Sequence, residues 1–248
     1  MKRLRGKRSF GIKFFLAVTC VVFACLAVLA SPFFYITEIE FAGSTVYSDA
    51  ALTNELGLFS GRNDSILYRS GRTMETNLER LPYIKSAYVT KQFPNTLSVR
   101  IVERIPTALV FDDKLGLYLT IDIDGYVLDI LSFPRENKPV MTGIRLAGYS
   151  IGQPLVSEGS VNLMPTVTRL STIFDRYGLT NVARADVSNL NAIRLFINDI
   201  IIHIGSMQDA DAKILMAMAC LRELEITDRG TLFVYDVDNV VFQFATNR

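Results

Sequence analysis

The sequence contains no tryptophan, only one histidine (His203), and no acidic residue before Glu38. His203 has no second histidine and no cysteine cluster beside it to complete a zinc site, and nothing around it resembles a nucleophilic triad. A glycine-rich phosphate loop, a Gly-x-Ser-x-Gly motif and an HExxH motif are also missing. These absences argue against an enzyme, and we expect no catalytic residue, no metal and no cofactor.

The charge of the 248-residue chain is divided unevenly along its length. Six of its 26 basic residues fall within residues 1–13, although the formal net charge is only +1. The remainder therefore holds 20 basic and 25 acidic residues. A mildly acidic domain lacks the basic face of a nucleic-acid binder, so we expect no nucleic-acid partner.

Residues 14–30, FFLAVTCVVFACLAVLA, form the one long apolar run. About 17 to 25 apolar residues span a bilayer as a helix, so the sequence predicts a transmembrane helix over 14–32 that contacts membrane lipid. The basic residues precede it, which places the tail 1–13 in the cytoplasm and the bulk of the chain outside. A cleavable signal peptide ending at "VLA" before Ser31 is the alternative, although Pro32 and the length of the run disfavour it. Both interpretations export the rest of the chain.

The cysteines do not indicate a disulfide. Cys20 and Cys25 lie in the predicted membrane segment, and Cys220 has no intrachain partner in the exported part. Cys220 belongs to an apolar helical pattern, AKILMAMACLREL, which predicts a buried small hydrophobic side chain.

The first exported stretch alternates strand and helix patterns. Residues 33–41 alternate like a half-buried strand, and 48–57 predict a helix with Ser48 as its N-cap. Residues 70–82 predict a second helix closed by Pro82. Two strands follow around a Pro-Asn-Thr turn at 94–96. Their inward face is predicted to contain Leu97, Val99 and Ile101, opposite Ala87 and Val89. The order strand, helix, helix, strand, strand predicts a small α+β unit.

From Thr107 onward, short strand patterns predominate, with two helical patterns between them. The helices are predicted over 160–179 and 209–224, and the closing strands over 231–237 and 239–245. We expect a second, β-rich α+β domain.

Two groups of residues invite a chemical interpretation that we do not favour. Thr120, Asp122, Asp124 and Gly125 fit the start of a calcium loop, but its twelfth position is Leu131 where a bidentate Glu is needed. A β-turn at Asp124-Gly125 explains the stretch better.

His203 alternates with Ile202 and Ile204, which indicates a structural or surface position on one face of a strand. Asp112 and Asp113 are expected to be solvated turn residues.

The last strand has a different character. Val240, Phe242 and Phe244 alternate with Val241 and Gln243, so both faces carry apolar side chains. A terminal strand is often an edge strand, and an apolar edge invites pairing by a partner. The alternation alone does not decide between such an edge and a strand paired on both sides.

The stretch LPYIKSAYVTKQFPNTLSVRIVERIPTA resembles the signature of the POTRA domain as found in the FtsQ/DivIB family of bacterial cell-division proteins. The resemblance rests on Leu81, Pro82, Ile84, Ala87, Val89, Pro94, Thr96, Leu97, Val99, Glu103, Arg104, Pro106 and Ala108. It continues downstream in TIDIDGYVLD, in PVMTGI and GQPL, in a strand followed by Gly205, Ser206 and a helix bearing Lys213, and in GTLFVYDVDNVVFQF. The short tail and compact second domain are similar to the DivIB branch.

The resemblance implies a cytoplasmic tail at 1–13, a membrane helix at 14–32, a POTRA domain (β-α-α-β-β) at 33–106 and a C-terminal β-domain at 107–248. It implies a non-enzymatic, single-pass scaffold at the division septum that binds FtsL-like and FtsB/DivIC-like bitopic proteins and helps to regulate septal peptidoglycan synthesis. The family's partner contact lies in its last strands, which here correspond to Tyr235, Asn239, Val240, Val241, Phe242, Gln243 and Phe244. At the domain junction, Glu103 and Arg104 are expected to form a structural pair, with a recruitment contact as the alternative.

Two other functions remain open at this stage. A POTRA module can serve protein secretion or envelope assembly, but such proteins usually carry several copies or a β-barrel. An exported hydrolase that uses a carboxylate is the second alternative, and turnover of peptidoglycan fragments would distinguish it from a scaffold.

Overall fold

The fold is described from a computed structural model of the chain, which divides into two compact units. It describes residues 7–58, 64–134, 138–158, 162–179, 181–225, 228–236 and 239–245, with the backbone alone at 7–12 and 235. Unit 1 comprises the chain up to Arg80 together with Ile84–Glu103, and unit 2 comprises Leu81–Tyr83 and everything from Arg104 onward. Most of the predicted tail 1–13 lies outside the described residues.

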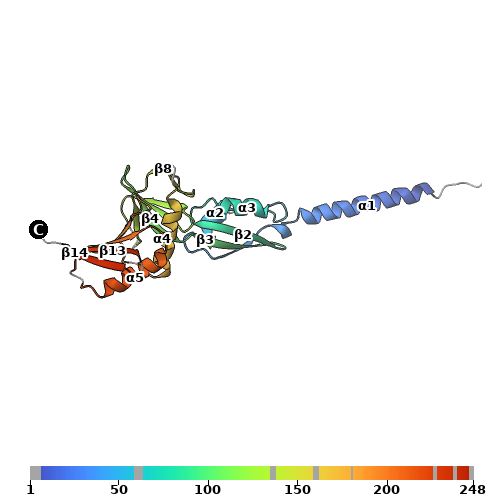
Figure 1. The fold of residues 1–248 in the computed structure, drawn as a ribbon. Helices are drawn as coiled ribbons and strands as arrows, with labels where there is room; N and C mark the ends of the chain where they lie inside the picture. Colours follow the sequence, from blue (N-terminus) through green and yellow to red (C-terminus); the bar gives the residue numbers. More distant parts are fainter. Residues whose placement is uncertain are drawn as a thin grey trace, which may run out of the picture. The chain divides into compact units, whose positions relative to one another are not determined.

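Unit 1 begins with the long helix α1 and continues as a small α+β fold. Its elements are α1 (Lys7–Leu29), the 3-10 turn η1 (Pro32–Phe34), β1 (Glu38–Ala42), α2 (Asp49–Glu55), α3 (Gly71–Leu78), β2 (Ile84–Gln92) and β3 (Thr96–Glu103). The sheet has the order β1-β3-β2, in which β3 pairs parallel with β1 and antiparallel with β2. Figure 1 shows α2 and α3 over one face of this sheet. The predicted order of strands and helices is confirmed.

The core of unit 1 lies between these helices and the sheet. Leu97, Val99 and Ile101 are buried on β3, as predicted from their alternation, and Ala87 is buried opposite them. Val89 is only partly buried. Ser48 caps α2 as predicted, because its side chain accepts a hydrogen bond from the backbone N–H of Ala51.

The predicted strand over 33–41 is wrong in its first half. Pro32 opens the 3-10 turn instead, and the backbone of the next residues bonds to two distant segments. Ile36 donates its N–H to the carbonyl of Asp64, and Thr37 donates to that of Asn95. Tyr35 forms an isolated antiparallel bridge with Ser65, and pairing within the sheet begins at Glu38. The second predicted helix also ends earlier than expected, at Leu78 rather than beside Pro82.

Unit 2 is built on one nine-stranded mixed sheet with the order β14-β13-β12-β11-β10-β7-β4-β5-β6. Its strands are β4 (Pro106–Asp112), β5 (Leu117–Asp122), β6 (Val127–Leu131), β7 (Val140–Thr142), β10 (Arg184–Asp186), β11 (Ile193–Ile197), β12 (Ile200–Gly205), β13 (Gly230–Asp236) and β14 (Asn239–Phe244). A short ribbon is formed by β8 (Leu146–Gly148) and β9 (Val156–Ser157), and the helices are α4 (Met164–Arg176) and α5 (Ala210–Arg222). The prediction of a β-rich α+β fold is confirmed.

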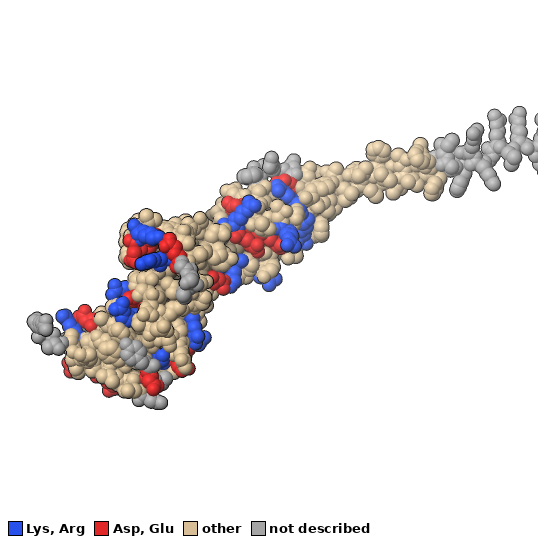
Figure 2. Space-filling view, turned by 45° about the horizontal axis from the view of Figure 1, so that its top comes forward, with Lys and Arg blue, Asp and Glu red and all other residues tan. Residues whose placement is uncertain are grey.

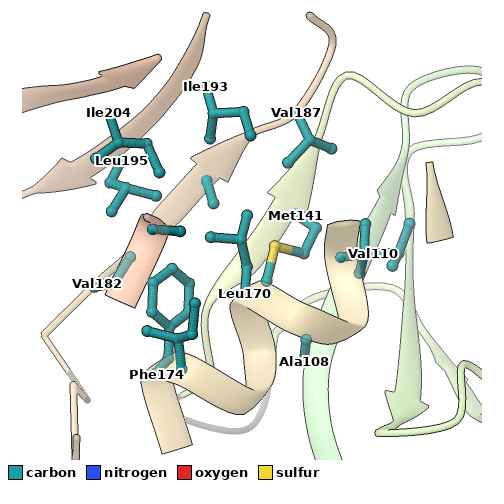
Figure 3. Packing of buried hydrophobic residues seen from close by; sticks show 14 of the residues in the cluster. Ala108, Val110, Met141, Leu170, Phe174, Val182, Val187, Ile193, Leu195 and Ile204 are labelled. Atoms are coloured by element: carbon teal, nitrogen blue, oxygen red, sulfur yellow. The ribbon is translucent and has the colours of Figure 1, made fainter. Parts of the chain in front are cut away.

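The core of unit 2 is one continuous cluster between the sheet and its helices. Leu170 and Phe174 of α4 point toward Met141 and Leu195 on the strands (Figure 3). Ile214 of α5 joins the same cluster. One face of the sheet therefore packs against the two helices along most of its width, up to its last strand.

A candidate partner-binding edge at the last strand

The last strand, β14, occupies one edge of the nine-stranded sheet. Among the described residues its only strand partner is β13, with which it pairs antiparallel from Gly230 opposite Phe244 to Asp236 opposite Asn239. The question that the sequence left open is settled in favour of an edge strand. The other backbone side of β14 is available for a further strand.

The side chains of β14 divide between the core and the surface. Val240 and Phe242 are partly buried against the core cluster, which fixes the strand in place. Phe244 lies on the same face with 62% of its surface exposed, and its ring meets that of Phe242 edge to face with centroids 4.8 Å apart. Val241 is 52% exposed on the opposite face, and Gln243 is also exposed. The strand is thus anchored in its middle and apolar at its surface.

The backbone orientation at the end of β14 can be deduced from one hydrogen bond. Ala245 donates its N–H to the carbonyl of Arg229, at 2.8 Å, on the side of β13. Successive residues of a strand direct their backbone groups to opposite sides, so the N–H of Phe244 and that of Phe242 point away from β13. These groups can pair with an added strand.

Gly230 permits the close pairing that holds β14 in position. A Cβ atom at this residue would overlap the backbone carbonyl of Gln243 on the facing strand. Sequence reasoning did not single out this residue, although a glycine at the start of a strand can signal a close approach of two backbones.

The outward face of the sheet next to β14 carries aromatic side chains that sequence reasoning also missed. His203 stacks on Phe233 with ring centroids 5.1 Å apart, and Phe233 lies opposite Val241 in the strand register. Burial, followed by the nearby Arg194 charge, lowers the pKa of His203. His203 therefore adds a stacked ring beside Phe233 next to the edge, consistent with the predicted structural or surface position.

Six of the seven predicted contact residues lie on the edge strand, and the seventh lies on its neighbour. Six of them form β14, where Asn239 begins the strand and is exposed. Tyr235 belongs to the neighbouring strand β13, and its side chain lies outside the described residues. The site is consequently a strand edge rather than a cleft.

Glu103 and Arg104 do not pair with each other, which corrects that expectation. The Glu103 carboxylate accepts four hydrogen bonds from the loop after β1: from the hydroxyls of Ser44 and Thr45, and from the backbone N–H groups of Thr45 and Val46. Burial acts to raise the pKa of Glu103, but these hydrogen bonds outweigh it and lower the pKa from its ordinary value. Glu103 thus closes this loop onto the end of β3.

Arg104 makes its contacts in unit 2. Its Nη1 donates to the buried carboxylate of Asp122 at 2.6 Å, and its guanidinium lies 3.7 Å from the ring centroid of Tyr126. The other oxygen of Asp122 accepts the backbone N–H groups of Asp124 and Tyr126. Gly125, with φ +80°, supplies the left-handed conformation within this turn. The predicted β-turn is confirmed, and the Asp122 carboxylate is already occupied by protein donors.

The other residues that could carry out chemistry are also engaged in contacts within the fold. Asp112 is buried and accepts hydrogen bonds from the Tyr149 hydroxyl and the Lys114 backbone, which contradicts the expectation of a solvated turn residue. Burial, and then Asp112, raise the pKa of Tyr149. Cys220 is partly buried against the core. Across the described ranges, no group of three His, Cys, Asp or Glu side chains is arranged to hold a metal ion.

Helix α1 exposes a series of large apolar side chains, including Phe14, Phe15 and Phe23. Figure 2 shows the described part of this helix almost entirely without charged residues, whereas Lys, Arg, Asp and Glu intermingle on the rest of the visible face. Within the part of the chain that the structure describes, no helix combines the length and the mean hydropathy of a membrane span.

Comparison with known proteins places these features in one family context. A family model described as a POTRA domain of the FtsQ type matches residues 34–104. The cell division protein DivIB of Clostridium botulinum strain Hall is 26% identical over 251 residues, covering 97% of this chain and 92% of the relative. DivIB of Clostridium tetani is 26% identical over 195 residues (78% and 72%), and the cell division protein FtsQ of Anaeromyxobacter is 30% identical over 129 residues (52% and 41%).

Proposed function

Because the chain belongs to the FtsQ/DivIB family of bacterial cell-division proteins, we propose that it is a non-enzymatic, membrane-anchored scaffold of the division machinery. Its partners would be FtsL-like and FtsB/DivIC-like bitopic proteins, and its role would be to help assemble and regulate septal peptidoglycan synthesis. Binding, rather than chemistry, is the activity that its surface features support.

The single observation that carries this proposal is the outer edge of β14, with which no other described strand pairs. Strand addition uses backbone hydrogen bonds for affinity and adjacent side chains for specificity. The outward N–H groups of Phe242 and Phe244 supply the backbone hydrogen bonds. The exposed side chains of Phe244 and Val241 supply the specificity. Val240 and Phe242 anchor the strand in the core, so that a partner meets an already ordered template.

Anchoring by α1 would strengthen such an interaction. The run 14–30 has no charged residue, and the Thr19 hydroxyl donates to the carbonyl of Phe15, so its polar group is satisfied inside the helix. Confining two bitopic partners and this chain to the same membrane raises their effective concentration, and modest pairwise affinities then suffice.

The test is co-purification of the full chain with an FtsL-like and DivIC-like pair, using two variants. Phe244→Pro removes one outward N–H without touching the β13 hydrogen bonds, and we expect it to abolish the complex. Phe244→Ala retains this N–H while losing the ring, and should weaken the complex at most about tenfold, since one exposed aromatic contact contributes about 1 kcal/mol. Phe242→Asp is unsuitable because it would place a charge against the core.

The matched pair separates the two possible modes of contact. If Phe244→Pro binds as well as the wild type while its circular dichroism is unchanged, the strand-addition proposal is wrong. Equal losses in Phe244→Pro and Phe244→Ala would assign the contact to the ring rather than to the backbone.

A further inference from the structure

Three aromatic side chains at one end of the unit 1 sheet are largely exposed. Phe33, Tyr68 and Phe93 have 63%, 76% and 62% of their surfaces exposed. Phe33 lies in η1, Tyr68 in the loop before α3, and Phe93 in the turn between β2 and β3. The parallel register that pairs Glu38 with Thr96 brings this turn beside the start of β1. Figure 1 shows the turn at the end of the sheet from which α1 extends.

Hydrogen bonds join the segments that carry these aromatics. Ile66 donates its N–H to the carbonyl of Phe34 at 2.8 Å, which ties the Tyr68 loop to η1. Thr37 and Asn95 are joined twice, through a backbone bond of 3.0 Å and a side-chain bond of 2.7 Å, which ties the β2–β3 turn to the start of β1. The segments that carry the three rings are therefore tied together at this end of the unit.

The same end of the unit follows α1 with almost no intervening linker. The helix ends at Leu29, and Ser31 still donates its N–H to the carbonyl of Val28 at 3.1 Å. Phe33 is four residues beyond the helix end, and because Ser31 is extended and Phe33 lies in a 3-10 turn, these residues span about 6–14 Å. The headgroup layer on each side of a bilayer is about 5–8 Å thick, so a helix that crosses the hydrocarbon core places Phe33 in that layer or directly beside it.

A surface cavity of about 370 Å³ lies between the end of α1 and this aromatic end. Its lining is apolar where it is formed by α1 and polar elsewhere, and consists of Leu29, Ala30, Tyr35, Asp64, Ser65, Tyr68 and Arg69. Arg69 and Asp64 form an ion pair of 2.9 Å, so the charges in the lining balance. A neutral hollow with an apolar wall beside a helix end suits the glycerol and upper acyl region of a phospholipid.

We propose that this end of unit 1 docks into the headgroup layer of the membrane, with Phe33, Tyr68 and Phe93 as interfacial anchors. The inference rests on the anchoring by α1 proposed above. Aromatic rings concentrate at the membrane–water interface because one side of this layer is apolar and the other is wet. The run 14–30 is about 26 Å long as a helix, slightly short for a core of about 30 Å, and this mismatch draws the flanking aromatics toward the bilayer. Docking would hold the domain at a fixed height over the membrane.

The absence of tryptophan from the chain gives a clean experiment. Single substitutions Phe33→Trp, Tyr68→Trp and Phe93→Trp are made in the full chain, which is reconstituted in vesicles of equal parts phosphatidylglycerol and phosphatidylcholine. The phosphatidylcholine carries bromine, a fluorescence quencher, near either the glycerol end or the terminal methyl of its acyl chains. Phe23→Trp reports insertion of α1. Tyr88→Trp is the matched control, because this exposed tyrosine on β2 lies five residues, about 16 Å, from Phe93 along the strand.

We expect Tyr68→Trp and Phe93→Trp to lose most of their emission with bromine near the glycerol end, and little with bromine near the methyl end. Phe33→Trp should behave similarly, but its closeness to α1 makes the other two positions decisive. Phe23→Trp should be quenched by the deep bromine, and Tyr88→Trp by neither. If Phe23→Trp is quenched while Tyr68→Trp and Phe93→Trp match Tyr88→Trp, the docking is wrong and the anchor stands. If Phe23→Trp is not quenched, the anchoring itself is wrong.

Discussion

At the residue scale, Glu103 shows how one carboxylate organises a loop. It receives all four hydrogen bonds from Ser44, Thr45 and Val46, and its pKa is lowered as a result. We predict that Glu103→Gln destabilises unit 1 by about 1–2 kcal/mol at pH 7, because an amide group presents one acceptor and turns its own donors toward the others. Urea denaturation, with hydrogen exchange to assign the affected unit, measures the difference.

The pH dependence of this difference has a definite sign. A carboxyl group whose pKa is lower in the folded state than in the unfolded state stabilises the fold when the pH is above the unfolded-state pKa, here 4.5. This contribution is lost as the pH falls below 4.5 and through the folded-state pKa. The gap between wild type and Glu103→Gln should therefore be full at pH 7 and close in acid. Glu40→Gln, on an exposed position of β1, is the control. A gap that stays constant from neutral to acidic pH would contradict the assigned role of the charge.

At the element scale, local signals were predictable from the sequence and distant pairings were not. Ser48 reveals the start of α2 because capping involves only neighbouring residues. The false strand over 33–37 arose because its alternation is genuine, while its backbone partners, Asp64 and Asn95, are far away in the chain. The order of the nine-stranded sheet was equally inaccessible, since β12 pairs parallel with β13 only after the chain has passed through α5.

The pairing of β13 with β14 depends on Gly230, and this element can be tested directly. We predict that Gly230→Val detaches part of β14, because its side chain would collide with the carbonyl of Gln243. The expected cost is about 1–3 kcal/mol, as for other overpacked sites. Hydrogen exchange should accelerate over 239–245 while β11 and β12 stay protected. Thr231→Val, one residue along the same strand, should leave exchange unchanged. Exchange in Gly230→Val that matches the wild type would show that β14 does not need this close approach.

At the scale of the whole molecule, the sequence predicted which strand carries the candidate binding edge, but not why one side of that strand is unpaired. Alternation in the last strand predicted which side chains share a face, and Val240 and Phe242 do lie together toward the core. That β14 has an unpaired side depends on the order of all nine strands, which no local pattern contains. Glu103 and Arg104 were likewise visible as adjacent charges, yet their partners lie up to 59 residues away in the chain, within two different units.

Whether residues 1–30 stay attached or are cleaved as a signal peptide affects the entire chain. Anchoring requires that residues 1–30 remain attached, whereas a cleaved signal would leave Ser31 as the first residue. The last hydrogen bonds of α1 reach this point, since Ala30 donates to Leu26 and Ser31 to Val28, and Pro32 follows immediately. A peptidase would therefore have to break these hydrogen bonds to cut there. We expect the chain isolated from membranes to retain peptides from the basic tail by mass spectrometry, and alkaline carbonate washing to leave it in the membrane. A mature chain that begins at Ser31 would refute the anchor, and with it the effective concentration on which weak binding at β14 depends.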